Sequence, residues 1–362
     1  MRCKRYLPPE QLEHFFAGFD THTKTTLGVS VENRPIQMIK IGTGPYKVLM
    51  WSQMHGNEST TTKALLDFVP WFLDENQKKI QLSFTLYIIP QLNPDGSYLY
   101  TRHNANNIDL NRDAIDQSQP ESRVLRAIYE KTQPDLCLNL HGQRTIYAAG
   151  KSGHSASLSF LSPSADVERT VTPARKKAMG LISALAKALE KELPNAIGRY
   201  DDTFNANCVG DSFTLAGTPT ILFEAGHVPN DYQREQTRVH VFNAYKALFT
   251  SLIEHQYFFE LRDYLKIPKN EVEFCDLILS GVSILDEGNK FVNQKIAIQY
   301  RETLTHGEIE FLPEMIAYGA ELQLRAHKYI RIPESLKTVD LEFKSETLVK
   351  NTAFINLFSL KS

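Results

Sequence analysis

Two histidines and a glutamate in this sequence fall where an α/β protein could hold a metal. His55 and Glu58 are three residues apart and follow the apolar run "KVLMWSQM", and His141 follows "DLCLNL". Functional groups of α/β sheets gather at the carboxyl ends of strands, so we expect these three side chains to meet. Two imidazoles and one carboxylate form a zinc site that leaves a fourth position for water.

A second carboxylate could complete this chemistry. Glu224 ends the apolar run "TILF", where it could take a proton from a zinc-activated water and pass it to a leaving nitrogen. Each feature is weak alone, because an isolated histidine is more often structural. Among the 11 histidines, however, only His55 is followed by glutamate three residues later. The combination, rather than any single residue, predicts a zinc hydrolase.

A polar segment lies between the two halves of the expected metal site. It runs from Asn93 to Asp113 and reads "NPDGSYLYTRHNANNIDLNRD", which predicts a long loop that starts with a turn. Arg102 and Arg112 place two guanidinium groups there, and a guanidinium can pair with a carboxylate or polarise a carbonyl oxygen. Asp109 could orient a zinc-bound imidazole. The alternative is an ordinary asparagine-rich surface loop.

The elements that would position these residues alternate between strands and helices, which predicts an α/β domain with a mostly parallel or mixed sheet. The expected strands are residues 28–41, 46–53, 81–90, 135–142 and 218–226, and the expected helices are residues 59–72, 120–132, 175–193 and 232–259.

From about Lys269 the apolar pattern has a period of two, which predicts a small all-β module. Its expected strands include "VEFCDLILSG", "QKIAIQY", "TVDLEFK" and "TAFINLFSL". The predicted organisation is an N-terminal extension (1–27), a catalytic domain (28–268) and a β domain (269–362). His306 and His327 are isolated in this domain, and we expect structural roles for both.

Composition narrows the classes of protein that fit. The chain has 362 residues, a hydrophobic content of 42% and a net charge of −2, as in ordinary globular proteins. It has no long basic run, no apolar stretch of about 18 residues and no signal-peptide pattern near its first residue, so neither a nucleic acid nor a membrane partner is expected. Its four cysteines form no CxxC pair, which favours a reducing, cytoplasmic setting.

Five motifs together resemble the zinc carboxypeptidase family, peptidase family M14. They are "HGNE" (55–58), "NPDG" (93–96), "RHNANNIDLNR" (102–112), "LHG" (140–142) and "FEAG" (223–226). They occur in the family's order and span roughly two thirds of the chain. The resemblance implies a mixed sheet sandwiched between helices and one zinc ion, which carboxypeptidase A holds with two histidines and a glutamate.

The resemblance also implies a role for each matching residue. His55, Glu58 and His141 would bind zinc, and Asp109 matches the family's supporting carboxylate. The remaining matches would act on the substrate: Glu224 as general base and then acid, Arg102 as the group that polarises the scissile carbonyl, and Asn111 and Arg112 as the pair that holds the terminal carboxylate.

The sequence departs from the family before its last strand. Digestive carboxypeptidases cap the substrate with a tyrosine from a mobile loop, whereas "YDDTFNANCVGDSFTLAGTP" has no tyrosine at the matching place. Phe204 or Asn207 lies near it. Asp211, in the part that lines the specificity pocket of relatives, could favour a substrate with an amine or a basic side chain. Alternatively, it is a turn aspartate bonded to backbone.

These features predict a metallocarboxypeptidase that acts on a peptide with a free C-terminal carboxylate. One alternative is an N-acyl amino acid amidohydrolase, because aspartoacylase and succinylglutamate desuccinylase relatives share "HGNE" and a C-terminal β module. They are not expected to keep "NPDG" or "NANNIDLNR". Further alternatives are an amidase for γ-glutamyl peptides of the bacterial cell wall and a zinc- or peptide-binding protein without activity.

Overall fold

The computed structural model describes residues 4–20, 23–286, 289–332 and 341–342, which form two compact units. Unit 1 contains the described residues of 1–143 and 149–270, and unit 2 those of 144–148 and 271–362. The main division therefore lies within two residues of the predicted boundary at 268/269. The structure adds the short segment 144–148 to unit 2, where the backbone N–H groups of Glu273 and Phe274 donate to the carbonyl of Ile146.

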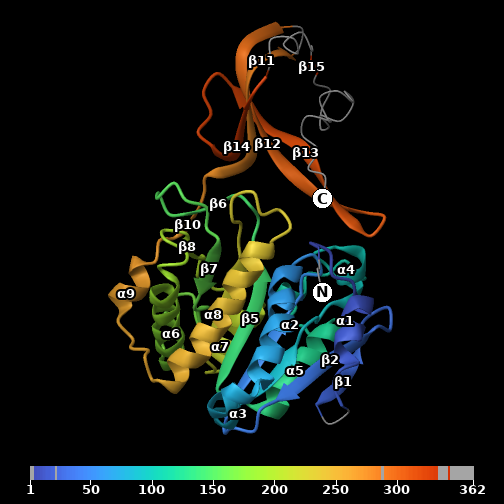
Figure 1. Ribbon diagram of the computed structural model, residues 1–362, viewed down its shortest axis with the longest axis vertical. Helices are drawn as coiled ribbons and strands as arrows, with labels where there is room; N and C mark the ends of the chain where they lie inside the picture. Colours follow the sequence, from blue (N-terminus) through green and yellow to red (C-terminus); the bar gives the residue numbers. More distant parts are fainter. Residues whose placement is uncertain (1–3, 21–22, 287–288, 333–340, 343–362) are drawn as a thin grey trace. The chain divides into compact units, whose positions relative to one another are not determined.

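A mixed sheet lies at the centre of unit 1 (Figure 1). It has eight strands in the order β1-β2-β4-β3-β5-β9-β7-β8. Strands β4, β3, β5 and β9 are parallel to one another, and the antiparallel pairs are β1/β2, β2/β4 and β9/β7. The strands are β1 (Lys24–Val29), β2 (Pro35–Ile41), β3 (Tyr46–Ser52), β4 (Phe84–Ile89), β5 (Leu136–Gly142), β7 (Leu158–Leu161), β8 (Ile197–Arg199) and β9 (Thr220–Ala225).

Helices cover both faces of this sheet, which confirms the predicted fold class. One face packs against α1 (Pro9–Phe16), α2 (Ser59–Leu73), α6 (Pro173–Leu189) and α8 (Glu235–Ile253). The other packs against α5 (Pro120–Thr132) and α7 (Val209–Leu215). Because both faces are buried, the central strands are mostly apolar and do not alternate. The remaining helices are α3 (Lys78–Ser83), α4 (Pro94–Leu99), α9 (Leu261–Lys266), η1 (Glu75–Gln77) and η2 (Leu110–Arg112).

Three parts of unit 1 differ from the sequence-based expectation. The segment 93–113 is not one loop, because Asn93 caps the short helix α4, with Pro94 in its first turn. Strands β7 and β8 were not predicted, since three or four residues are too few to show a period. Residues 1–27 include part of the core rather than an extension alone, because Leu12 and Phe16 are 4% and 2% exposed.

Unit 2 contains a five-stranded sheet. Residues His306 and Gly307 form a two-residue turn with φ values of 50° and 80°, which joins two antiparallel strands. Nε2 of His327 donates a hydrogen bond to the carbonyl of Thr145 at 2.8 Å, and the imidazole stacks on Phe274. The strands are β11 (Phe274–Asp286), β12 (Asn289–Thr305), β13 (Glu308–Gly319), β14 (Arg325–Arg331) and β15 (Leu341–Glu342), and β6 (Tyr147–Ala149) pairs with β10 (Asn270–Val272). The predicted strand "TAFINLFSL" lies outside the described residues.

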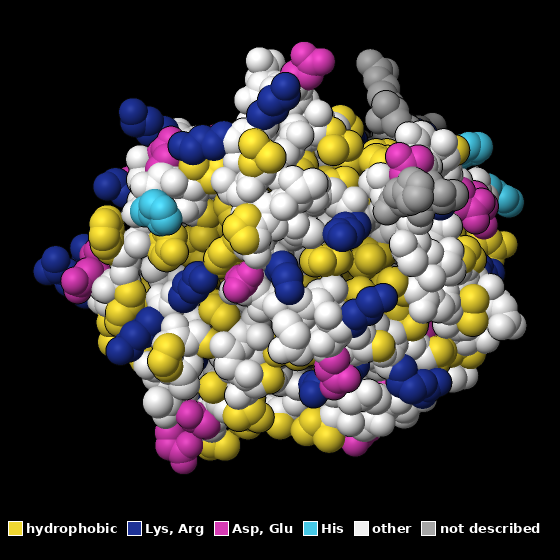
Figure 2. Space-filling view, turned by 90° about the horizontal axis from the view of Figure 1, so that it is seen from below, with side chains coloured by type: hydrophobic (Ala, Val, Ile, Leu, Met, Phe, Trp, Pro, Cys, Tyr) yellow, Lys and Arg dark blue, Asp and Glu magenta, His cyan; other side chains and the backbone are white. Residues whose placement is uncertain are grey.

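The surface carries charges of both signs. On the face that Figure 2 shows, Lys and Arg side chains are interspersed with Asp, Glu and hydrophobic side chains, and the whole chain has a net charge of −2. No helix in the described part of the chain has both the length and the hydrophobicity to span a membrane.

Candidate active site

His55, Glu58 and His141 converge at the carboxyl end of the central strands. His55 follows β3, Glu58 immediately precedes α2, and His141 is the penultimate residue of β5. One ligand atom from each lies within 4.8 Å of the other two, and no other described group of three or more His, Cys, Asp or Glu side chains has this arrangement. The sequence therefore predicted correctly which three side chains meet.

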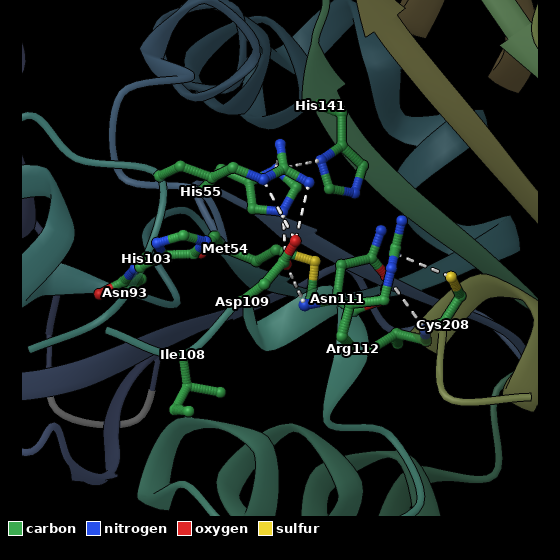
Figure 3. Close-up of polar contacts among 12 residues, drawn as sticks. Met54, His55, Asn93, His103, Ile108, Asp109, Asn111, Arg112, His141 and Cys208 are labelled. Carbon is green, nitrogen blue, oxygen red and sulfur yellow. Dashed lines mark hydrogen bonds and ion pairs between the residues drawn. The ribbon is translucent and has the colours of Figure 1, made fainter. Parts of the chain in front are cut away.

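The spacing of these atoms fits a metal ion. Nδ1 of His55 lies 3.2 Å from Nδ1 of His141, and two nitrogen ligands of a tetrahedral zinc ion lie about 3.3 Å apart. Oε1 and Oε2 of Glu58 each lie 2.9 Å from one of these nitrogens. On the far side of the ring, Nε2 of His55 lies 3.0 Å from Oδ1 of Asp109 (Figure 3). When the proton of His55 is on Nε2, facing Asp109, the lone pair of its Nδ1 atom points toward His141 and Glu58. A cation between these three residues would stabilise this arrangement.

Electrostatics around the three residues also favours a cation. Burial lowers the pKa of His141, which keeps its imidazole neutral as metal binding requires. Burial opposes the ionisation of Glu58, but the two histidines hold the pKa of its carboxyl below the ordinary range. Burial likewise opposes the ionisation of Asp109, and the hydrogen bond with His55 again lowers its pKa. Two ionised carboxylates thus surround the imidazoles.

Glu224 lies beside His141. The two residues are register partners on the parallel neighbours β5 and β9, whose backbones are about 4.8 Å apart. The Glu224 side chain is buried, and its Oε2 atom has no hydrogen-bond partner among the residues that the structure describes. Burial raises the pKa of this carboxyl well above its ordinary value, and the charge of Glu58 raises it further. Glu224 therefore has an oxygen available for a proton.

Arg102 lies beside two of the three ligands, His55 and Glu58. Its Nε and Nη2 atoms donate to Oδ2 of Asp109 at 3.2 and 3.0 Å, and Nη1 lies 3.2 Å from Nδ1 of His55 and 3.5 Å from Oε1 of Glu58. The side chain is 44% exposed. Its charge can therefore reach a molecule that approaches from solvent.

Two glycines bring the "HGNE" and "NPDG" motifs into contact. A Cβ atom at Gly56 would lie 2.0 Å from the backbone carbon of Gly96 and 2.2 Å from the nitrogen of Ser97. Asn93 adds a bond from its Nδ2 to the carbonyl of Met54 at 3.2 Å. The close backbone approach fixes the segment that carries His55, and it explains why glycine is needed at position 56.

Replacing Gly56 by alanine is expected to lower the free energy of unfolding by about 1–3 kcal/mol, because the new methyl group must displace backbone. Thermal or denaturant unfolding measures the effect. Gly18→Ala is a matched control, since a Cβ there would meet Phe15 at an ordinary 3.6 Å. Equal stability of the two variants would contradict the close packing of the two motifs.

Asn111 and Arg112 lie next to the ligands, in η2. Oδ1 of Asn111 accepts the N–H of Val209, and Nη1 of Arg112 donates to Sγ of Cys208 at 2.9 Å (Figure 3). Asp109 caps the same short helix and links it to His55. The structure thus brings the predicted substrate-binding pair close to the predicted metal ligands.

Comparison with known proteins decides the family. The sequence profile of the zinc carboxypeptidase family matches residues 19–263, more than half of the chain. The chain belongs to the zinc carboxypeptidase family. Members of this family depend on zinc, and the group formed by His55, Glu58 and His141 is compatible with binding it.

Curated relatives and solved structures agree with this assignment. Carboxypeptidase SOL1 of Arabidopsis thaliana is 32% identical over 139 residues, which cover 32% of this chain and 28% of that protein. Carboxypeptidase D of Drosophila melanogaster is 32% identical over 162 residues, with coverages of 36% and 11%. The chain thus matches less than a third of either relative. A metallo-carboxypeptidase from Burkholderia cenocepacia shares the fold, with a TM-score of 0.55, 17% identity and coverages of 70% and 71%.

Asp211 of this family member lies on α7, where both oxygens of its carboxylate accept backbone N–H groups. Oδ1 accepts from Ser164 at 3.0 Å and Oδ2 from Asn205 at 2.8 Å. Such bonds hold two loops in place, which agrees with the alternative that Asp211 is an aspartate bonded to backbone. A role in substrate specificity remains a prediction from the family resemblance.

The stability of the protein should depend on pH through Asp211. Burial raises the pKa of this carboxyl from 3.8 to about 6. Between about pH 4 and 6 the unfolded chain ionises while the folded carboxyl stays protonated, so stability falls as the pH rises. The loss is complete above pH 6 and amounts to at most about 3 kcal/mol. Denaturant unfolding at pH 4, 5, 6 and 7 measures the free energy of unfolding of the wild type and of Asp211→Asn. The difference between the two proteins should change across this pH window. A constant difference would contradict the assignment.

Sequence reasoning missed the contacts of Asn207 and Cys208 in this family member. Asn207 was noted only as a neighbour of the position where relatives carry the capping tyrosine. The one signal in the sequence was the asparagine-rich run "NANC", since asparagine often bonds to nearby backbone in turns.

Proposed function

We propose that the protein is a zinc-dependent metallocarboxypeptidase that hydrolyses the C-terminal amide bond of a peptide with a free carboxylate. The observation that supports it most is the convergence of His55, Glu58 and His141, with Glu224 on the adjoining strand position. In this proposal the three converging residues hold zinc. Zinc bound there supplies a water acidic enough to act as a nucleophile near neutral pH.

Glu224 is the proton carrier of the proposed reaction. Its carboxylate accepts a proton from the attacking water as the water oxygen bonds to the scissile carbonyl carbon. It then donates that proton to the amide nitrogen as the C–N bond breaks, so that a carboxylate and an amine leave. The unpartnered Oε2 atom of Glu224, the register partner of His141 on the adjoining strand, supports this role.

Arg102, Asn111 and Arg112 position the substrate. The exposed guanidinium of Arg102 donates to the carbonyl oxygen, where negative charge develops during attack. Asn111 and Arg112 bind the terminal carboxylate, since an amide and a guanidinium offer N–H donors to its oxygens. Recognition of this carboxylate restricts cleavage to the last residue of the chain.

Incubation of the zinc-loaded protein with three substrate sets tests the function. The sets are peptides with free and amidated C-termini, N-acyl amino acids and γ-glutamyl dipeptides, and mass spectrometry identifies the products. Release of the last residue from free peptides but not from amidated ones is expected. Exclusive deacylation, or no cleavage in any set, would overturn the proposal.

A further inference from the structure

The chain segment that precedes α7 is bonded to the segment that follows Asn111 and Arg112. Asn207 makes three of these bonds. Its carbonyl accepts the N–H of Ala114 at 3.2 Å, its Oδ1 accepts the N–H of Ile115 at 2.8 Å, and its Nδ2 donates to Oδ2 of Asp116 at 2.9 Å. One asparagine therefore holds three consecutive residues of the neighbouring segment.

The next two residues of the same segment contact the predicted carboxylate-binding pair itself. The N–H of Val209 donates to Oδ1 of Asn111 at 3.0 Å, and Sγ of Cys208 accepts from Nη1 of Arg112. The carbonyl of Asn111 accepts a second bond from Arg112 at 2.7 Å. We call residues 111–116 and 207–209 the clamp.

Within the clamp, the charge of Arg112 is not neutralised. Its guanidinium forms no ion pair with any carboxylate of the described residues, whereas Arg102 pairs with Asp109. The partner of Arg112 is a thiol, and burial raises the pKa of Cys208 to about 11, so the sulfur is neutral at pH 7. A fixed guanidinium with neutral partners keeps its full charge for an anion from solution.

We propose that Asn207 is a positioning residue that holds Asn111 and Arg112 in the geometry that binds the terminal carboxylate of the substrate. The inference rests on the proposed function and concerns how its substrate site is assembled. An arginine side chain loses much conformational freedom when it binds, and a pre-positioned one loses less. The cost of removing Asn207 should therefore appear in substrate binding rather than in the chemical step.

Steady-state kinetics of the zinc-loaded protein tests this role, with a peptide that the wild type cleaves at its free C-terminus. Asn207→Ala removes the two side-chain bonds of Asn207, and we expect KM to rise about tenfold or more while kcat changes less than about threefold. Asn207→Asp should raise KM in the same way, because the new carboxylate cannot donate to Asp116 and repels it. The double variant Asn207→Asp/Asp116→Asn exchanges donor and acceptor, and should return KM to within about threefold of the wild type.

Asn106→Ala is the matched control. This variant removes an asparagine of the loop that precedes η2, whose side chain bonds to Gln119 and not to the clamp, and its KM should equal that of the wild type. Unfolding midpoints are measured for every variant, and if Asn207→Ala does not fold, the Asp variants carry the test. A wild-type KM in the Asn207 variants, or no recovery in the double variant, overturns the positioning role. Failure of the wild type to cleave any free C-terminus would instead count against the proposed function.

Discussion

Replacing Glu224 by glutamine is expected to lower kcat by about 10²–10⁴-fold, the usual contribution of a positioned general acid or base. Glutamine has the same shape but cannot take up the proton of the attacking water. Because Glu224 is not one of the three converging ligand residues, the variant should still bind zinc. Turnover of a C-terminally free peptide and the zinc content of the purified protein are the two measurements.

A control separates this effect from a general effect of charge. Glu235 pairs with Lys63 and Arg238 away from the ligands, and Glu235→Gln should keep wild-type kcat. Full turnover in Glu224→Gln would remove Glu224 from the mechanism. Loss of zinc from that variant would show that Glu224 acts on the metal site instead.

The second large effect is expected at Glu58. In the wild type, the N–H of Gly142 donates to Oε2 of Glu58 at 2.9 Å. Glu58→Gln keeps an oxygen for this bond but removes the negatively charged ligand. We expect zinc affinity to fall by more than about 10–100-fold, the loss that is typical when a residue hydrogen-bonded to a metal ligand is removed. Activity should fall with it at limiting zinc.

Thermal unfolding with and without zinc measures this loss independently of activity. Added zinc should raise the unfolding midpoint of the wild type, because it binds the folded state, and this rise should be smaller or absent in Glu58→Gln. Asp109→Asn, which changes the residue behind His55, should give an intermediate rise. Equal stabilisation of all three proteins by zinc would contradict the proposed ligand set.

The family assignment bears on the alternatives that the sequence left open. The family match and the curated relatives reported above are of carboxypeptidases, so neither the N-acyl amino acid amidohydrolase nor the γ-glutamyl amidase is favoured. The substrate test distinguishes all three by their products. Because the curated relatives are matched over less than a third of their length, activity and substrate remain proposals for this chain.

The sequence alone determined the elements with strong periodic signals and the residue types that do chemistry. The central strands were predicted from their continuous apolar runs, and the long helices α2, α5, α6 and α8 were predicted because each is long enough to show a helical period. His55, Glu58 and His141 were predicted because each lies at or just beyond the carboxyl end of such a strand, and the parallel strands end at one edge of the sheet.

The tertiary structure alone decided what depends on contacts between distant segments. The sequence contains no sign that a Cβ at Gly56 would collide with Gly96, or that the carboxylate of Asp211 would be bonded to two loops. The hydrogen bonds of Asn207 join residues about 90 positions apart. Local propensity and periodicity describe neighbours along the chain, whereas these contacts arise only when the folded sheet brings separate loops to the same edge.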